Sequence, residues 1–340
     1  MKKDDRNTGI DLIKTVCMIF VIMIHTPLKP FESNLVAGVS LLAVLFVSNG
    51  LFYLVSGKLN LAKEFHSAKD IKQFYKKRLV SIILPYLLVC IGLSFVDMML
   101  KDDRDWSMFF QFTYKNIMSD NVSLHLWFMY YLVGFLLSTP FVSKFLHACD
   151  KDELKILFWL AIGWNVFYVY LTTDLGITFW YRGFILEEYA VLYVLGYLAD
   201  RIVDEKNEKF FYIAGVIGFV ISIAGKSIFK ENFFFWVDLH PGYIFFILAV
   251  YRLIDRKVRI KNAHVKKFLS FNAKYSFLIF LLHYHIMLHL APLVVKTQIG
   301  WLNFLESTAF TYVVAMASAI LLENLVLRHI RKATGRLLKV

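Results

Sequence analysis

The chain has 340 residues, of which 58% are hydrophobic, and its mean hydropathy is +0.57. A soluble protein of this size needs far more polar surface, so the composition excludes a soluble enzyme and predicts an all-α, polytopic membrane protein. The formal net charge of +12 suits a nucleic-acid-binding protein as well as a membrane protein, so the placement of the basic residues must separate the two classes.

Ten apolar segments have about the length of a membrane-spanning helix. They are 11–27, 38–57, 79–100, 124–142, 155–172, 184–199, 210–228, 233–251, 273–292 and 304–327. The loops between them are short, so we expect one integral-membrane domain over residues 1–340 with no appended soluble domain. The longest outer connection, 101–123, mixes aromatic and polar residues and is typical of an interfacial or re-entrant segment.

The distribution of basic residues predicts the orientation of these spans in the membrane. If the N-terminus is cytoplasmic, most of the 38 lysines and arginines fall on the cytoplasmic side, as the positive-inside rule requires. Ten spans then leave both termini in the cytoplasm. Topology therefore explains the basic excess, and we expect membrane lipids and no nucleic acid among the partners.

The first predicted helix carries ionisable residues that a simple membrane anchor lacks. Lys14 and His25 are eleven positions apart, close to three full turns, and Asp11 precedes Lys14 by three positions. All three side chains therefore share one face, with His25 about 16 Å along the axis from Lys14. Ionisable residues within a span usually mark a reaction site or a pathway, although a histidine at a helix end can also be structural. We predict catalysis within the membrane, with His25 at its centre.

A run of three cations, Lys76-Lys77-Arg78, leads into the third predicted span. At a cytoplasmic membrane entry, such a run can hold the phosphates of a nucleotide-bearing donor. The same pattern also serves as positive-inside charge or as a contact for anionic lipid, and the run alone does not separate these interpretations.

His125 and Trp127 begin the fourth predicted span on the outer side, at the depth of His25. Their imidazole and indole groups suit an acceptor sugar, and they equally suit an interfacial aromatic belt.

The ninth predicted span contains three histidines. His283 lies about midway along it, where a polar side chain needs a partner. His285 and His289 share a face four positions apart, but no third ligand lies at a nearby spacing, so we expect no metal site. Further candidates for the same polar interior are Glu187, Glu188, Asp238, His240 and Glu323.

Taken in order, these segments resemble the membrane acyltransferase family 3. The motifs that carry the resemblance are Asp11-Leu12-Ile13-Lys14 with His25-Thr26, Tyr53-Leu54-Val55-Ser56-Gly57, Lys76-Lys77-Arg78 with Pro85, His125-Leu126-Trp127-Phe128, Arg182-Gly183-Phe184 with Gly196-Tyr197, and Ser276-Phe277-Leu278-Ile279-Phe280-Leu281-Leu282-His283. They extend over nearly the whole chain, and their order is more specific than any one of them.

The chain departs from the family pattern in two places. Lys14 stands where the family has arginine, which keeps the charge but loses the bidentate hydrogen bond. The double glutamate that many members carry after the fourth motif is replaced by Met129-Tyr130-Tyr131. These departures place the chain nearer the branch that acts on cell-surface polysaccharides. The start of the chain, Gly9-Ile10-Asp11 with Ile24-His25-Thr26, also resembles the membrane half of vancomycin-resistance-type serine/alanine racemases, without the racemase domain.

The resemblance implies O-acyl transfer in a bacterial plasma membrane, most often of acetyl from cytoplasmic acetyl-CoA to a hydroxyl of a cell-surface polysaccharide or lipid-linked glycan. In that scheme His25 is the general base or a transient acyl carrier, and Asp11 and Lys14 orient its helix and the donor. Acyl-CoA is then a substrate, and no permanently bound cofactor is expected. The residues implied for the donor phosphates are Lys76, Lys77 and Arg78, and those implied for the acceptor are His125, Trp127, Arg182 and His283.

The alternative is a transporter of a small polar solute or a glycan, and a third possibility is a sensor or binding subunit. Ten helices and intramembrane charges fit a transporter as well. A transporter has no need of a phosphate clamp, however, and usually has helices interrupted by glycine or proline. Pro241 is the one mid-span proline, so the sequence favours acyl transfer.

Overall fold

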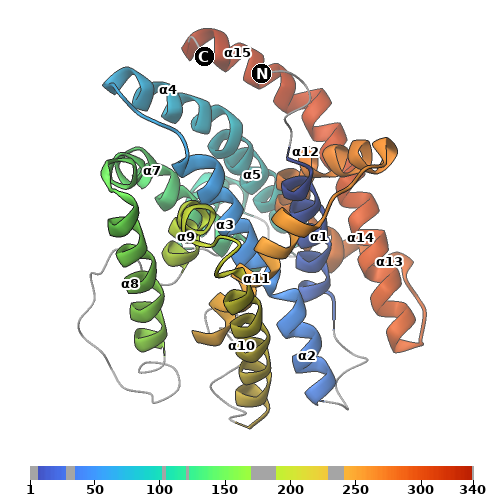
Figure 1. Cartoon of the computed structure of the whole chain (residues 1–340). Coiled ribbons are helices and arrows are strands. Elements are labelled where there is room, and N and C mark those ends of the chain that lie inside the picture. Colours follow the sequence, from blue (N-terminus) through green and yellow to red (C-terminus); the bar gives the residue numbers. More distant parts are fainter. Residues whose placement is uncertain are drawn as a thin grey trace. The chain divides into compact units, whose positions relative to one another are not determined.

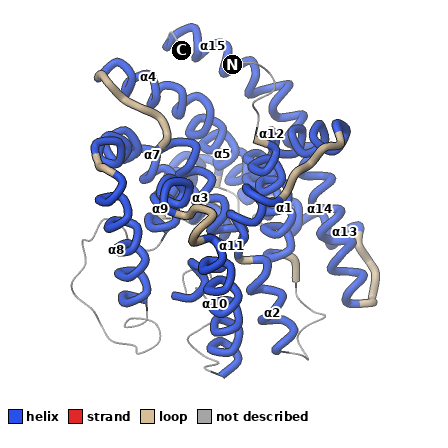
Figure 2. The backbone as a smooth tube through the Cα atoms, viewed as in Figure 1, coloured by secondary structure: helices blue, strands red, loops and turns tan. Residues whose placement is uncertain are grey.

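The computed structural model describes residues 7–27, 35–101, 105–119, 122–169, 189–228 and 241–338, and the regular secondary structure in these ranges is helical (Figures 1 and 2). Contacts between residues divide the chain into two compact units. Unit 1 comprises residues 1–64 and 138–274, and unit 2 comprises residues 65–137 and 275–340. Two helices, α7 (Trp127–Ala148) and α12 (Ala263–His285), contribute residues to both units. The single domain expected over residues 1–340 stays a prediction.

Unit 1 is built on helices α1, α3, α9 and α11, with α2, α8 and α10 packed against them. Helices α3 and α9 approach so closely that two glycines are required. A Cβ atom on Gly57 would lie 1.7 Å from the carbonyl oxygen of Tyr193, and one on Gly196 would lie 1.9 Å from that of Leu54. Small residues at such positions let helix backbones touch within a membrane. The helices of unit 1 are α1 (Thr8–His25), α2 (Leu35–Leu45), α3 (Val47–Leu61), α8 (Lys151–Val169), α9 (Tyr189–Ile202), α10 (Glu208–Ile228) and α11 (Pro241–Lys257).

Unit 2 contains long helices that are interrupted by single wide turns. Ser67 and Asp70 form a capping box that starts α4, which continues through the π-helical turn η2 into α5. Two further π-helical turns, η7 and η8, lie after α12 and α14, and such turns are frequent at functional sites. The elements of unit 2 are α4 (Ala68–Arg78), η2 (Leu79–Ile83), α5 (Leu84–Met99), η3 (Trp106–Met108), α6 (Phe109–Met118), η4 (Leu124–Leu126), η7 (Ile286–Leu290), α13 (Ala291–Val294), α14 (Gly300–Leu322), η8 (Glu323–Leu327) and α15 (Arg328–Leu338).

The predicted membrane-spanning segments coincide with helices. Among the described residues, six helical stretches are long and apolar enough to cross a membrane. They are Thr8–His25, Ala37–Leu61, Ala68–Met99, Leu124–Ala148, Ala263–Val294 and Gly300–Gly335. The other four predicted spans overlap α8, α9, α10 and α11. The all-α, polytopic membrane fold is therefore confirmed.

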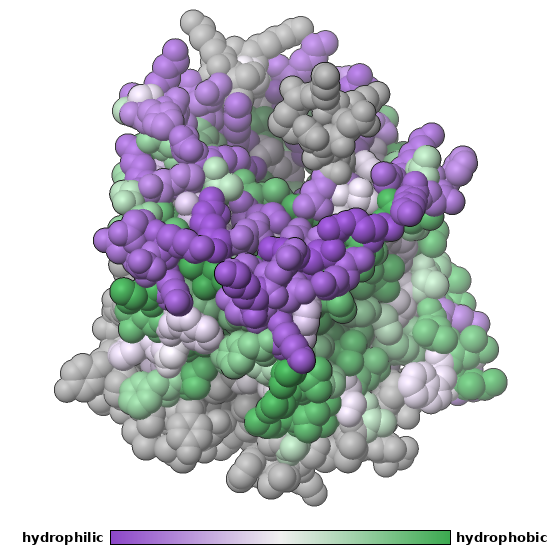
Figure 3. All heavy atoms as spheres, in the orientation of Figure 1, coloured by the Kyte–Doolittle hydropathy of each residue, from purple (hydrophilic) through white to green (hydrophobic). Residues whose placement is uncertain are grey.

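The surface of unit 1 changes character along its helices. In Figure 3 hydrophilic side chains gather over the end of α11 and the loop that follows it, whereas the surface over α10 is hydrophobic. The α10 side chains Val216, Ile217 and Val220 are all more than half exposed. This pattern is expected of helices that lie in lipid and end at a water-facing edge.

Candidate active site

Helix α1 carries the three residues that the sequence singles out. Asn7 caps its start by accepting hydrogen bonds from the backbone N–H groups of Gly9 and Ile10, at 2.9 and 3.2 Å. The helix then runs unbroken to His25 in its last turn, so Lys14 and His25 lie on one continuous helix, as predicted. Asp11 is buried in the first turn, and both Lys14 and His25 are half-buried. The roles of these residues stay predictions.

Beyond α1, unit 1 contains a charge network that the sequence analysis missed. The Lys58 ammonium lies 3.0 Å from Asp200 and 3.2 Å from Asp255, and it donates to the Tyr251 hydroxyl at 2.6 Å. Tyr251 and Arg252 both donate to Asp200, at 2.7 and 3.1 Å. Two cations thus face two carboxylates from α3, α9 and α11. Arg252 is buried and the other three side chains are half-buried, and a buried charge is tolerated where it is paired. Lys58 and Arg252 are among the basic residues that the positive-inside rule explains by position alone, and that rule gives no sign of their partners.

A cavity of about 510 Å³ lies in unit 1 between the start of α1 and the segment after α11. Three cations line it, Arg259, Lys261 and Lys266, against a single carboxylate, Asp255. The remaining lining residues are Asn7, Thr8, Gly9, Val258 and Ile260. The excess of positive charge favours an anionic ligand.

The predicted donor-binding run lies at the end of α4 in unit 2. Lys77 is exposed, whereas Lys76 and Arg78 are half-buried. The Arg78 guanidinium stacks over the Phe74 ring at 5.1 Å from its centroid, and Phe74 packs edge-on against Phe65. Arg78 is therefore held by an aromatic contact, while Lys77 presents its charge to the surroundings.

Two of the predicted acceptor-side histidines lie in contact in unit 2. His125 is 1% exposed and His283 is fully buried, and their ring centroids lie 4.7 Å apart. The Nδ1 of His283 donates to the Phe280 carbonyl at 2.7 Å, because a carbonyl oxygen can only accept. His125 stacks on Tyr284, with centroids 5.4 Å apart. The structure thus joins two histidines that are far apart in the sequence.

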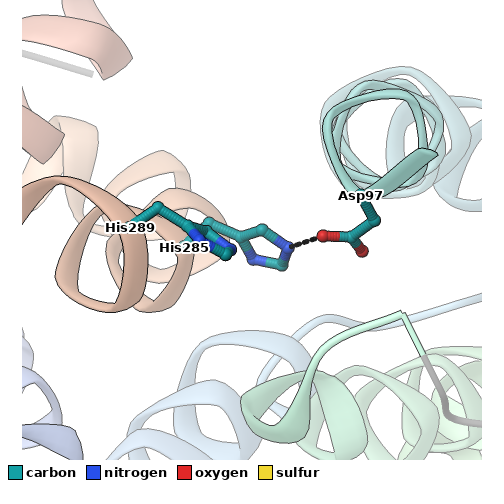
Figure 4. A group of neighbouring side chains, drawn as sticks. All are labelled: Asp97, His285 and His289. Carbon is teal, nitrogen blue, oxygen red and sulfur yellow. Dashed lines mark hydrogen bonds and ion pairs between the residues drawn. The ribbon is translucent and has the colours of Figure 1, made fainter. Parts of the chain in front are cut away.

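A chain of hydrogen bonds connects His125 to the carboxylate of Asp97. Ser123 Oγ lies 2.9 Å from His125 Nδ1 and 3.4 Å from His285 Nδ1, and His285 Nε2 lies 3.2 Å from an Asp97 carboxylate oxygen. Figure 4 shows that the side chains of His285 and His289 lie next to each other and leave their helical segment on the side that faces Asp97. Asp97 and Ser123 were not among the residues predicted from the sequence. An isolated acid in the last turn of an apolar span, such as Asp97, is nevertheless a sequence feature that indicates a polar site within the membrane.

Of the remaining predicted residues, Trp127 and Glu323 are described, and the others lie outside the described part of the chain. Trp127 is half-buried at the start of α7, with its ring near those of Phe128 and Tyr131. Glu323 makes an ion pair with Arg331, at 2.7 Å, which gives it a structural role. The residues outside the described ranges are Arg182, Glu187, Glu188, Asp238 and His240.

The comparison with known families identifies the class of protein. The acyltransferase family 3 model, described as an acyltransferase domain, matches residues 7–323. The chain belongs to this family, and it is a multi-pass membrane acyltransferase. No curated protein and no solved structure matches the chain significantly. The match extends through both units and favours acyl transfer over the transporter alternative.

Proposed function

We propose that this enzyme moves an acetyl group from cytoplasmic acetyl-CoA to a hydroxyl of a cell-surface glycan, with His25 as the general base. The observation that carries the proposal is α1 itself, where a half-buried imidazole lies eleven positions beyond Lys14 on one unbroken helix of an acyltransferase-family chain. An imidazole titrates near neutral pH, so it can accept a hydroxyl proton and then return it.

The reaction has a simple balance of bonds and protons. His25 takes the proton of the acceptor hydroxyl while the oxygen attacks the thioester carbonyl carbon. The C–S bond then breaks, and the departing CoA thiolate receives the proton from the imidazolium. In the variant with a transient acyl carrier, a His25 nitrogen attacks the thioester carbonyl carbon, the C–S bond breaks, and the CoA thiolate takes the imidazole N–H proton. The acceptor oxygen then attacks the acyl-imidazole, the C–N bond breaks, and the hydroxyl proton passes to the released imidazole nitrogen. Lys14 and Asp11, at the cytoplasmic end of α1 in the predicted topology, orient the donor arm.

Two groups of cations are suited to the CoA phosphates. The first is Lys76, Lys77 and Arg78, at the end of α4, where Lys77 is exposed. The second lines the cavity in unit 1, where three cations outnumber one carboxylate. Both groups fall on the cytoplasmic side in the predicted topology, where CoA is available. We assign the donor phosphates to the first group. Substitutions in the second group serve as the comparison that tests this assignment.

The acceptor side of the proposal is formed by imidazole and aromatic groups. The rings of His125 and His283 are in contact in unit 2, and Trp127 follows His125 by two residues. Flat aromatic rings and imidazole hydrogen-bonding groups are suited to a sugar ring with its hydroxyls. Arg182 belongs to the same proposed group by its family motif. A polysaccharide or a lipid-linked glycan is the acceptor class that fits.

The test is acetyl transfer by the purified protein in lipid nanodiscs, with labelled acetyl-CoA and a glycan acceptor. For His25→Ala we expect the turnover rate to fall by about 10²- to 10⁴-fold, because the general base is lost. His264→Ala is the matched control, since His264 is exposed near the start of α12. Near-normal turnover in His25→Ala with intact insertion contradicts the proposal, and so does loss of turnover in the control.

A further inference from the structure

Three potential metal ligands converge in unit 2 at the end of α5 and on the turn η7. Asp97, His285 and His289 each place one ligand atom so that all three atoms lie within 4.8 Å of one another. Asp97 comes from α5, and the two histidines come from the end of α12 and from η7 (Figure 4). The i, i+4 spacing of the histidines places both rings on one face of the helix.

The distances suit a small metal ion. Zinc bonds of about 2.0–2.1 Å at tetrahedral angles place neighbouring ligand atoms about 3.3 Å apart. The Nε2 of His285 lies 3.2 Å from the nearer Asp97 oxygen, which is close to the separation expected for two ligand atoms of one tetrahedral site. The third ligand atom lies within 4.8 Å, so a shift of about 1.5 Å of a half-buried side chain completes the set. Two imidazoles and one carboxylate are a donor set that Zn²⁺ favours.

The hydrogen bond between His285 Nδ1 and Ser123 is compatible with the ring orientation and the tautomer of a histidine that binds metal through Nε2. A histidine that binds metal through Nε2 carries its proton on Nδ1 and usually donates it to a neighbouring oxygen. His285 Nδ1 lies 3.4 Å from Ser123 Oγ, which in turn lies 2.9 Å from His125 Nδ1. One direction of donation, from His285 to Ser123 and from Ser123 to His125, satisfies both contacts.

The carboxylate side of the site is partly exposed. The Asp97 side chain is 29% exposed, whereas that of His285 is 10% exposed, so a further ligand would approach from the side of Asp97. Zinc sites with three protein ligands keep the remaining position for water or for a substrate oxygen. We propose that Asp97, His285 and His289 bind one divalent transition-metal ion, of which Zn²⁺ fits best, with an open coordination position for an oxygen ligand.

The experiment measures metal binding directly, without substrate, so its result is independent of the acyl-transfer test. The protein is purified with a tag that contains no histidine, stripped with a chelator, and titrated with Zn²⁺ in nanodiscs. We expect one Zn²⁺ per chain, and at least a tenfold loss of affinity in His289→Ala and in Asp97→Asn. His264→Ala is the matched control, because it removes an imidazole outside the cluster and should retain wild-type affinity.

A second measurement identifies the coordination. Cobalt substituted at the site should give the visible absorption of a tetrahedral ion in the wild type and lose it in His289→Gln. His289 is half-buried in the turn η7, so its glutamine variant is expected to fold, which size-exclusion chromatography and circular dichroism check. The proposal is overturned if the wild-type protein binds less than one equivalent of Zn²⁺, or if the variants bind it as tightly as the control does.

Discussion

Unit 1 and unit 2 both place polar groups among apolar helices, but they satisfy those groups in different ways. In unit 1 two cations and two carboxylates neutralise one another, and Arg252 at the centre is only 2% exposed. In unit 2 a group of imidazoles is joined by a serine hydroxyl to one carboxylate. A neutralised network holds helices together, whereas imidazoles keep nitrogen atoms that can bind a proton, a metal or a sugar hydroxyl. Substitutions should therefore lower stability in unit 1 and ligand binding in unit 2.

The largest loss of stability is expected for Arg252→Ala. The change removes the Arg252 hydrogen bonds to Asp200 and to the Val203 carbonyl, and a hydrogen bond to a charged group contributes about 1.5–3 kcal/mol. Thermal unfolding of the protein in detergent measures the loss. Arg259→Ala is the control, because Arg259 is exposed apart from contacts to nearby carbonyls, and its melting temperature should stay close to that of the wild type. Equal melting temperatures for the two variants would show that the network does not stabilise unit 1.

A smaller loss is expected for Gly196→Ala. The new methyl group would lie 1.9 Å from the Leu54 carbonyl oxygen, so α3 and α9 must separate, and overpacking of this kind costs about 1–3 kcal/mol. Gly163→Ala in α8 provides the matched control, since a Cβ atom there meets nothing within 4 Å. The same unfolding measurement compares the two. A Gly196→Ala variant as stable as Gly163→Ala would contradict the close approach of α3 and α9.

In unit 2, Ser123→Ala should affect metal binding more than stability. The serine hydroxyl joins His125 to His285, and the loss of one such hydrogen bond costs about 0.5–1.5 kcal/mol. Its loss should weaken Zn²⁺ binding by about 10- to 100-fold, because His285 loses the partner that orients its ring. Ser107→Ala serves as the control, since Ser107 bonds to Asp105 at the exposed start of η3. Unchanged Zn²⁺ affinity in Ser123→Ala would remove Ser123 from the site.

The smallest effects distinguish the two groups of cations. If Lys76, Lys77 and Arg78 hold the donor, Lys77→Ala should raise the KM for acetyl-CoA about 2- to 5-fold, since an exposed charge pair contributes up to about 1 kcal/mol. Lys261→Ala, in the cavity of unit 1, should leave KM unchanged. The two KM values, measured at low ionic strength, decide between the groups. The opposite result would move the donor phosphates to unit 1.

The sequence by itself determined the membrane class, the helical spans and the family. Mean hydropathy and span length require helices, because a backbone in lipid must satisfy its own hydrogen bonds. The motifs from Asp11 to His283 occur in the family's order, and the family match confirms the resemblance. The sequence also placed His25 and Lys14 on one helix, since helical periodicity depends only on spacing.

Only the tertiary structure decided which distant residues meet. Asp97 and His285 are 188 positions apart, and Lys58 and Asp255 are 197 positions apart. Helical periodicity relates residues on the same helix, and it carries no information about which face of one helix packs against another. The third ligand beside His285 and His289, and the partners of Lys58, therefore became visible only when the helices were packed together.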